Sequence, residues 1–424
     1  MKEFEGKKLL ILGGASQHCK VVEAAHDLGV LVYVADYLKD SPAKLIADYN
    51  FLIDVKAVDE LALLCKKENI DGVIATSLDA CVLPYYKLCK KMGYPCFGDG
   101  KQYEILTNKQ LFKECCKKYG IDTIPSYTID EIFNQNNVEY PIFIKPVDSR
   151  GSRGQSICFN REEAIIAIEK ARQESASENI LIEKYMEDYP DFTAGYLVLN
   201  GEPILVRTGD RFEGPKGSGI ENLCIASCSP SKYTEIYLKN TNKKVVEMLK
   251  GMKLKNAPVF FQGFIDKNTI RFYDPGLRFA GGEYETLLYH ATNINIIEIL
   301  VRYALGGDIS HIKLDNSICL LNGKYSVQLD PTLSPGIISS IQGIEEIKKN
   351  SSVLTISQRY EVGDQVVCSN DLRQRFAEFG ILSESIQQEV ENICFVQNTL
   401  KILDQKGNSM IVFPFDTEKI SISF

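Results

Sequence analysis

The chain has 424 residues, of which 45% are hydrophobic and 25% are charged, as is typical of a globular protein with two or three domains. Its 48 basic and 56 acidic residues give a net charge of −8, without a long basic run, so nucleic acid or an anionic membrane is not expected as a main partner. The lack of an apolar run near 18 residues, of a signal-peptide pattern and of metal-ligand spacing among the histidines argues against membrane insertion, secretion and zinc chemistry, and favours a cytoplasmic protein.

Residues 7–97 alternate between strand and helix patterns. Strands are expected at 8–12, 31–35 and 72–75, with a helix at about 19–28. This order predicts a doubly wound parallel sheet, within an α/β domain at residues 1–100. Asp79 follows a strand of the same sheet, where a helix N-cap is the expected role and substrate contact is the alternative.

The first loop of this domain raises a competing interpretation, a dinucleotide-binding dehydrogenase. Gly13 follows the first strand and Asp36 follows the second, as in dinucleotide folds. However, Gly13, Ala15 and His18 occupy the three glycine positions of the motif. Because a bulky third residue impairs helix packing and access to a pyrophosphate, the motif is incomplete.

Residues 140–154 have the pattern of a phosphate-binding segment. The apolar residues 142–144 predict a buried strand, and Lys145 lies at its end. The next residues include Arg150, Gly151 and Ser152, whose charge, small size and backbone amides suit anionic oxygens. A basic surface hairpin is the alternative interpretation.

Residues 161–173 predict an amphipathic helix, and residues 180–201 predict two strands with an acidic connector. The backbone of Lys184, Tyr185 and Met186 can bind the edge of an adenine, the thioether of Met186 can contact its face, and Asp191 can bind ribose hydroxyls. A phosphate-binding loop followed by a purine site indicates ATP.

The remaining chain divides into three parts. Residues 207–219 are rich in glycine and charge and predict a loop that contributes to the site. Residues 259–266 and 270–283 predict two strands with polar residues. From about residue 316, short antiparallel strands, a helix near 383–394 and a turn at Gly407 predict a small α+β lobe at 316–424.

This order of motifs resembles the ATP-grasp superfamily over most of the chain. The resemblance implies a two-lobed core at 101–315, with a lid lobe at about 122–188. Lys109 and Lys145 match the two cations that bind nucleotide phosphates in the family. Glu183 begins the segment that matches the adenine-binding hinge, and Asp191 matches the ribose-binding acid.

The metal-binding end of the site departs from the family pattern. Aligned on the acid and on the arginine four residues later, Gln262 and Asp274 become the metal ligands and Arg278 takes the place of the catalytic arginine. Gly276 replaces the usual asparagine. Water, phosphate or Glu283 can complete the shell of Mg2+, or of Mn2+, and the number of ions stays open.

The resemblance implies an ATP-dependent carboxylate–amine or carboxylate–thiol ligase that acts through an acyl phosphate and releases ADP and phosphate. Arg278 and Lys145 are the expected catalytic residues. The expected partners are a small carboxylate and an amine, and a homodimer is compatible with the sequence. A phosphotransferase of the same fold and a nucleotide-binding module without turnover are the alternatives.

Overall fold

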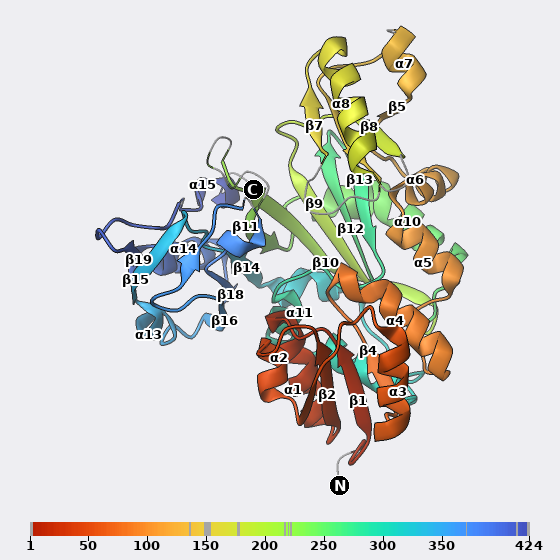
Figure 1. Ribbon diagram of the computed structural model, residues 1–424, viewed down its shortest axis with the longest axis vertical. Helices are drawn as coiled ribbons and strands as arrows, with labels where there is room; N and C mark the ends of the chain where they lie inside the picture. Colours follow the sequence, from red (N-terminus) through yellow and green to blue (C-terminus); the bar gives the residue numbers. More distant parts are fainter. Residues whose placement is uncertain are drawn as a thin grey trace.

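The computed structural model describes residues 3–134, 137–147, 154–175, 179–215, 218, 220, 223–369, 371–412 and 414–421. A large antiparallel sheet at the centre connects an N-terminal domain, a lid lobe and a C-terminal lobe (Figure 1). Among the helices built from the described residues, none combines the length and the apolarity that a membrane crossing requires. The predicted combination of α/β and α+β architecture is confirmed.

The N-terminal domain contains the predicted parallel sheet. Its four strands have the order β3-β2-β1-β4 and are β1 (Lys8–Leu12), β2 (Leu31–Asp36), β3 (Tyr49–Leu52) and β4 (Gly72–Ile74). The last four residues of β1 are buried, because helices cover the sheet. These helices are α1 (Cys19–Asp27, after a short 3₁₀ turn at Ser16–His18), α2 (Pro42–Ile46), α3 (Val58–Glu68) and α4 (Asp79–Met92).

Two helices, α5 (Gly100–Thr107) and α6 (Lys109–Lys118), lead into the lid lobe. The lobe has an antiparallel sheet of order β5-β8-β6-β7, formed by β5 (Ser126–Tyr127), β6 (Ile142–Pro146), β7 (Ser156–Cys158) and β8 (Ile180–Lys184). Helices α7 (Ile129–Asn134) and α8 (Arg161–Glu174) complete it. The predicted amphipathic helix is confirmed in α8, whose buried alanines pack with Ile142 and Ile144.

The central sheet has eight strands in the order β13-β12-β9-β10-β11-β14-β18-β16. They are β9 (Asp191–Leu199), β10 (Glu202–Glu213), β11 (Cys224–Ser229), β12 (Ala257–Asp266), β13 (Thr269–Gly276), β14 (Tyr325–Leu329), β16 (Val353–Gln358) and β18 (Ala377–Ser383). The predicted loop at 207–219 is wrong for its first seven residues, which belong to β10. Their cross-strand bonds to β9 and β11 outweigh the local turn preference of Gly209.

Further helices join these strands: α9 (Thr234–Tyr237), a π turn at Leu238–Asn242, α10 (Lys243–Gly251), α11 (Tyr284–Thr292), α12 (Ile296–Ala304) and 3₁₀ segments at Asn316–Gly323 and Leu372–Gln374. The C-terminal lobe adds β15 (Gly336–Gln342), β17 (Gln365–Val366), β19 (Lys401–Asp404), α13 (Ile344–Ile347), α14 (Ile386–Thr399) and α15 (Glu418–Ser421). Helix α14 confirms the predicted helix with later bounds, and Gly407 has a φ of 82° in the predicted turn. Because β14, β16 and β18 extend the central sheet, the predicted boundary at 316 stays a prediction.

Candidate active site

An open cleft is bounded by α4, the start of α6, the end of β6 and the end of β13. Its volume is about 560 Å³, within the range of about 300–1,000 Å³ that is usual for small-molecule sites. Lys145 and Asp274, which the sequence places on opposite sides of a nucleotide, both line it. The other lining residues include Asp79, Leu106, Thr107, Asn108, Lys109, Pro146, Val147, Pro275, Gly276 and Leu277.

Lys109 is the first residue of α6, where the side chain of Asn108 caps the helix by accepting from two N–H groups of the first turn. The Lys109 ammonium lies 3.1 Å from the Asp274 carboxylate. Burial alone lowers the pKa of Lys109, but the charges of Asp274 and Glu183 outweigh this effect and raise it. The predicted phosphate-binding lysine and the predicted metal ligand therefore meet in the cleft.

Glu183, on β8, is buried between two lysines. Its carboxylate lies 2.7 Å from Nζ of Lys145 at the end of β6, and its other oxygen contacts Nζ of Lys113 on α6. Burial alone raises the pKa of Glu183, but the two lysines outweigh burial and lower it. We refer to Lys113, Lys145 and Glu183 as the charged triad. It connects the lid sheet to the helix that carries Lys109.

Sequence reasoning missed Lys113. Its Nζ also donates to the carbonyl oxygen of Ile124 at 3.0 Å and to Oγ of Ser126 at 2.6 Å. Burial lowers its pKa, although Glu183 acts in the opposite direction. The sequence did contain a signal for Lys113, namely its spacing from Lys109, because a lysine four residues later lies on the same face of a helix.

The predicted phosphate-binding residues Arg150, Gly151 and Ser152 lie outside the described residues, so their role stays a prediction. The predicted adenine hinge follows β8. The N–H group of Lys184 donates to the carbonyl of Pro125 at 2.9 Å, and that of Tyr185 donates to the carbonyl of Pro141 at 2.9 Å. These two N–H groups attach the hinge to the lid and are not directed at a ligand.

Asp191 lies in a polar cluster at the start of β9. Nη1 of Arg211 is 2.5 Å from one Asp191 oxygen, and the Tyr273 hydroxyl is 3.2 Å from the other. In the amide orientation that gives both of its atoms partners, Gln262 accepts from Nη1 of Arg211 at 3.0 Å. Burial raises the pKa of Asp191 to about 7, against the effect of Arg211. One arginine thus joins the predicted ribose acid to a predicted metal ligand.

Arg278 follows the cleft residue Leu277, contacts the cleft residue Asp79 and is 9% exposed. Its Nε and Nη2 donate to the two carboxylate oxygens of Asp79 at 2.6 and 2.8 Å, and its Nη1 donates to the carbonyl of Phe279 at 2.7 Å. The N-cap prediction for Asp79 is wrong, because Leu78 holds that position and Asp79 is the first residue of α4. The described contacts use three of the five N–H groups of the guanidinium, which leaves two for a substrate oxygen.

A second pocket, of about 170 Å³, is lined by Gln262, the cross-strand partner of the cleft residue Asp274; we call it the arginine pocket. Its polar residues include Gln17, Thr193, Arg207, Arg211, Ser227, Gln328, Asp330 and Arg375. Strand register explains part of this set: Arg211 pairs with Asp191 and Ser227, and Ser227 pairs with Gln328, so these side chains share one face.

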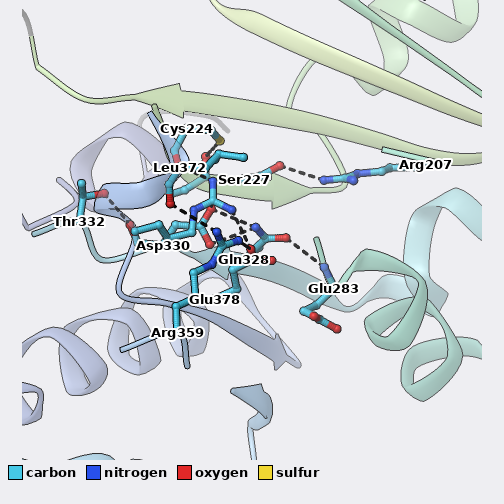
Figure 2. Close-up of polar contacts among 12 residues, drawn as sticks. Arg207, Cys224, Ser227, Glu283, Gln328, Asp330, Thr332, Arg359, Leu372 and Glu378 are labelled. Carbon is cyan, nitrogen blue, oxygen red and sulfur yellow. Dashed lines mark hydrogen bonds and ion pairs between the residues drawn. The ribbon is translucent and has the colours of Figure 1, made fainter. Parts of the chain in front are cut away.

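Charged groups in the arginine pocket are mostly paired. Arg375 lies 2.9 Å from Asp330 and 2.9 Å from Glu378, and Arg359 also reaches Glu378 (Figure 2). Burial raises the pKa of Asp330 to about 7. Sequence reasoning missed this pocket because the glycines of residues 207–219 indicated a loop. The even spacing of Arg207 and Arg211 was the available signal, since it puts both on one face of a strand.

Comparisons with known proteins agree with this geometry. A family model described as "Carbamoyl-phosphate synthase L chain, ATP binding domain" matches residues 108–197. The formate-dependent phosphoribosylglycinamide formyltransferase of Sulfurisphaera tokodaii is 24% identical over 327 residues, which cover 73% of this chain and 79% of that one. The protein of the same name from Prochlorococcus marinus (strain MIT 9515) is 25% identical over 200 residues, and those cover 45% of this chain and half of the relative.

Solved structures show the same fold. Phosphoribosylglycinamide synthetase from Anaerococcus prevotii superposes with a TM-score of 0.76 at 18% identity and covers 95% of this chain and 100% of that chain. A second structure is the biotin carboxylase domain dimer of Hydrogenobacter thermophilus 2-oxoglutarate carboxylase in complex with MgADP, ADP and bicarbonate. It superposes with a TM-score of 0.77 at 18% identity, and the match covers 93% of this chain and 90% of that chain. The chain has the ATP-grasp fold.

The structure gives a reason why the predicted metal-binding end departs from the pattern expected for the ATP-grasp fold. Gln262 and Asp274 are cross-strand partners on β12 and β13. A Cβ atom on Gly276 would lie 2.0 Å from Cε1 of Phe260, so an asparagine does not fit there. The described residues contain no group of three His, Cys, Asp or Glu residues that can hold a metal. One carboxylate suits a magnesium ion that is held largely by phosphate oxygens and water.

Glu283, the third residue considered as a ligand, faces the C-terminal lobe. Its carboxylate accepts from the Ser357 hydroxyl at 3.1 Å. Its N–H group donates to Oε1 of Gln328 at 3.0 Å (Figure 2). Burial raises the pKa of Glu283. Its described contacts therefore support the arginine pocket, not the cleft that contains Asp274.

The first loop of the N-terminal domain is filled by the protein's own side chains. His18 is fully buried, and a Cβ atom on Gly13 would lie 2.9 Å from its Cε1. Burial lowers the pKa of His18 to about 4, so its ring is neutral at pH 7. Asp36 accepts from the N–H groups of Gly14 and Leu38, each at 2.7 Å. These contacts leave no space for the pyrophosphate that the dehydrogenase interpretation requires.

Proposed function

We propose that the protein is an ATP-dependent carboxylate–amine ligase that activates its acid as an acyl phosphate and releases ADP and phosphate. The observation that carries this proposal is the shared cleft of Lys109, Lys145 and Asp274, which adjoins a buried polar pocket at Gln262. A polyphosphate site beside a separate small pocket suits a reaction between ATP and a second substrate.

The nucleotide lies in the cleft, with its adenine against Met186, which is 7% exposed. Lys109 and Lys145 bind the phosphates and offset the repulsion that an incoming carboxylate meets. Lys109 exchanges its contact with Asp274 for a phosphate oxygen. A magnesium ion bound by Asp274 would add positive charge at the phosphates.

In the first step, a carboxylate oxygen of the acid attacks the γ-phosphorus, the bond to the β-phosphate oxygen breaks, and ADP leaves. In the second step the amine attacks the acyl carbon, phosphate leaves, and the amine loses a proton. The two remaining N–H groups of Arg278 are available to the oxyanion that forms in this step, while Asp79 fixes the orientation of the guanidinium.

The expected substrates are a small carboxylate and an amine, in the cytoplasm, and a homodimer remains part of the proposal. The test is the release of ADP and phosphate, followed by ³¹P NMR, with dependence on both an acid and an amine. Release of AMP and pyrophosphate would contradict the proposal. A stable phosphorylated product without an amine would instead identify a phosphotransferase of the same fold.

A further inference from the structure

A guanidinium is buried in the arginine pocket with no described carboxylate within ion-pair distance. Burial lowers the pKa of Arg207 against the attraction of Glu285, a carboxylate that is itself paired with Lys20 at 2.5 Å. Arg207, on β10, is 6% exposed. Its Nη2 donates to Oγ of Ser227 at 2.9 Å (Figure 2). Its guanidinium carbon lies 4.5 Å from the ring centre of Tyr284. Its Nε has no hydrogen-bond partner in the described part of the chain. Because a buried charge is costly unless it is paired, this position indicates an anionic ligand.

The other two arginines of the pocket have carboxylate partners. Arg211 is paired with Asp191 at 2.5 Å, and Arg375 is paired with both Asp330 and Glu378. Among the described arginines that line the pocket, Arg207 is therefore the one without a carboxylate at ion-pair distance, and a ligand with one carboxylate would supply that contact.

A second side chain of the pocket also lacks a partner. Gln17, in the first loop of the N-terminal domain, is 9% exposed, and its Oε1 is buried without a hydrogen-bond donor among the described residues. Its amide packs against Gly281, where a Cβ atom would lie 3.1 Å from Nε2. The pocket thus presents one cationic donor and one neutral acceptor to a ligand.

Strand register puts this ligand next to the cleft. Arg207 pairs with Gly195 on β9, and Gln262 pairs with Thr193 on the same strand. Residues 193 and 195 share one face of the sheet, so both side chains project from the same side. Gly195 lets the arginine approach, because a Cβ atom there would lie 3.1 Å from Cβ of Arg207.

We propose that the arginine pocket binds the acid substrate, and that this acid is a short 2-amino or 2-hydroxy carboxylate. Its carboxylate pairs with Arg207, and the hydrogen-bond donor on its second carbon bonds to Oε1 of Gln17. A pocket of about 170 Å³ is below the usual range of about 300–1,000 Å³, which favours a small acid. This assignment rests on the proposed ligase function.

The test uses three acids of equal length: L-alanine, L-lactate and propionate. Binding is measured as a thermal shift without ATP, and activation is measured as ATP-dependent hydroxamate formation with hydroxylamine, which traps an acyl phosphate. The KM for L-alanine or for L-lactate is expected to be at least about tenfold lower than the KM for propionate, because propionate leaves Gln17 without a donor. Whichever of L-alanine and L-lactate has the lower KM shows whether the 2-substituent of the substrate is an amino or a hydroxy group.

Three variants separate the roles of the pocket residues. Arg207→Gln is expected to raise KM for the preferred acid by about 100-fold or more, with the ATP–Mg2+ thermal shift unchanged. It is also expected to raise Tm of the ligand-free protein, since an unpaired charge is removed, whereas Arg207→Lys recovers part of the affinity. Gln17→Leu is expected to abolish the preference over propionate while the affinity for propionate is retained.

The outcomes distinguish the two proposals. Hydroxamate formation with an unchanged KM in Arg207→Gln would overturn the acid site and leave the ligase function standing. Binding of a probe that depends on Arg207, without hydroxamate from any acid, would overturn the ligase function and leave the acid site standing. If none of the three acids binds or reacts, the assigned substrate class is wrong.

Discussion

Replacing Glu183 with glutamine removes the charge that joins the charged triad while retaining the size of the side chain. The Glu183 side chain is 2% exposed, and those of Lys113 and Lys145 are 8% and 11% exposed. In the Glu183→Gln variant, both ammonium groups lose their shared counter-ion in a place that water barely reaches. We therefore expect the variant to lose stability in the lid lobe and in the contact between the lid and α6.

The size of the expected stability loss in Glu183→Gln follows from the geometry of the triad. At the 2.7 Å separation of Lys145 and Glu183, the direct attraction is about 6 kcal/mol at an effective dielectric constant of about 20. Desolvation offsets part of this attraction, and removing one member of a buried pair costs about 3–5 kcal/mol. Because the pKa of Glu183 is lowered in the folded protein, this contribution is present above its ordinary pKa and is lost as pH falls through the folded value.

The assay is urea unfolding at pH 7, followed by far-UV circular dichroism because the chain has no tryptophan. The matched control is Glu139→Gln, which removes an exposed carboxylate from its 2.8 Å pair with Lys184 in the same lobe and should change stability little. The difference between Glu183→Gln and the wild type should shrink at acid pH. If both variants lose the same amount of stability at pH 7, the charged triad does not stabilise the lid as proposed.

Other substitutions test the cleft. Lys145→Met leaves Glu183 paired with Lys113, so the protein should stay folded but lose the thermal shift given by ATP–Mg2+; an unchanged shift would contradict its assignment. Asp274→Asn should raise the magnesium concentration needed for ADP release by about tenfold or more, whereas Glu283→Gln should leave that requirement unchanged, as magnesium titrations of turnover would show. Asp79→Asn weakens the fixed orientation of Arg278 and should lower kcat by about tenfold with little effect on KM for ATP; equal changes in both constants would indicate a binding role.

Local sequence patterns predicted much of the fold. The strands at 8–12 and 142–146 combine apolar side chains with clear boundaries, and Lys109 and Lys145 stand at the ends of their elements as expected. The joint position of Lys145 and Asp274 in one cleft is also confirmed. In these cases local preference and tertiary packing favour the same structure.

The sequence reasoning failed where long-range pairing determines the structure. Residues 207–213 resemble a loop in isolation, yet bonds to β9 and β11 make them a strand and bring Arg207 and Arg211 into a pocket with Gln328. Asp79 was assigned a local capping role, but its partner Arg278 lies 199 residues away in the chain. Contacts of such separation leave no periodic signal in one sequence.

A structure of the protein with magnesium and a non-hydrolysable ATP analogue tests the central claim most directly. The account predicts the adenine against Met186, the phosphates between Lys109 and Lys145, and the metal ion on Asp274. Nucleotide bound at Gly13 and Asp36, or on a surface remote from Lys145 and Asp274, would contradict it.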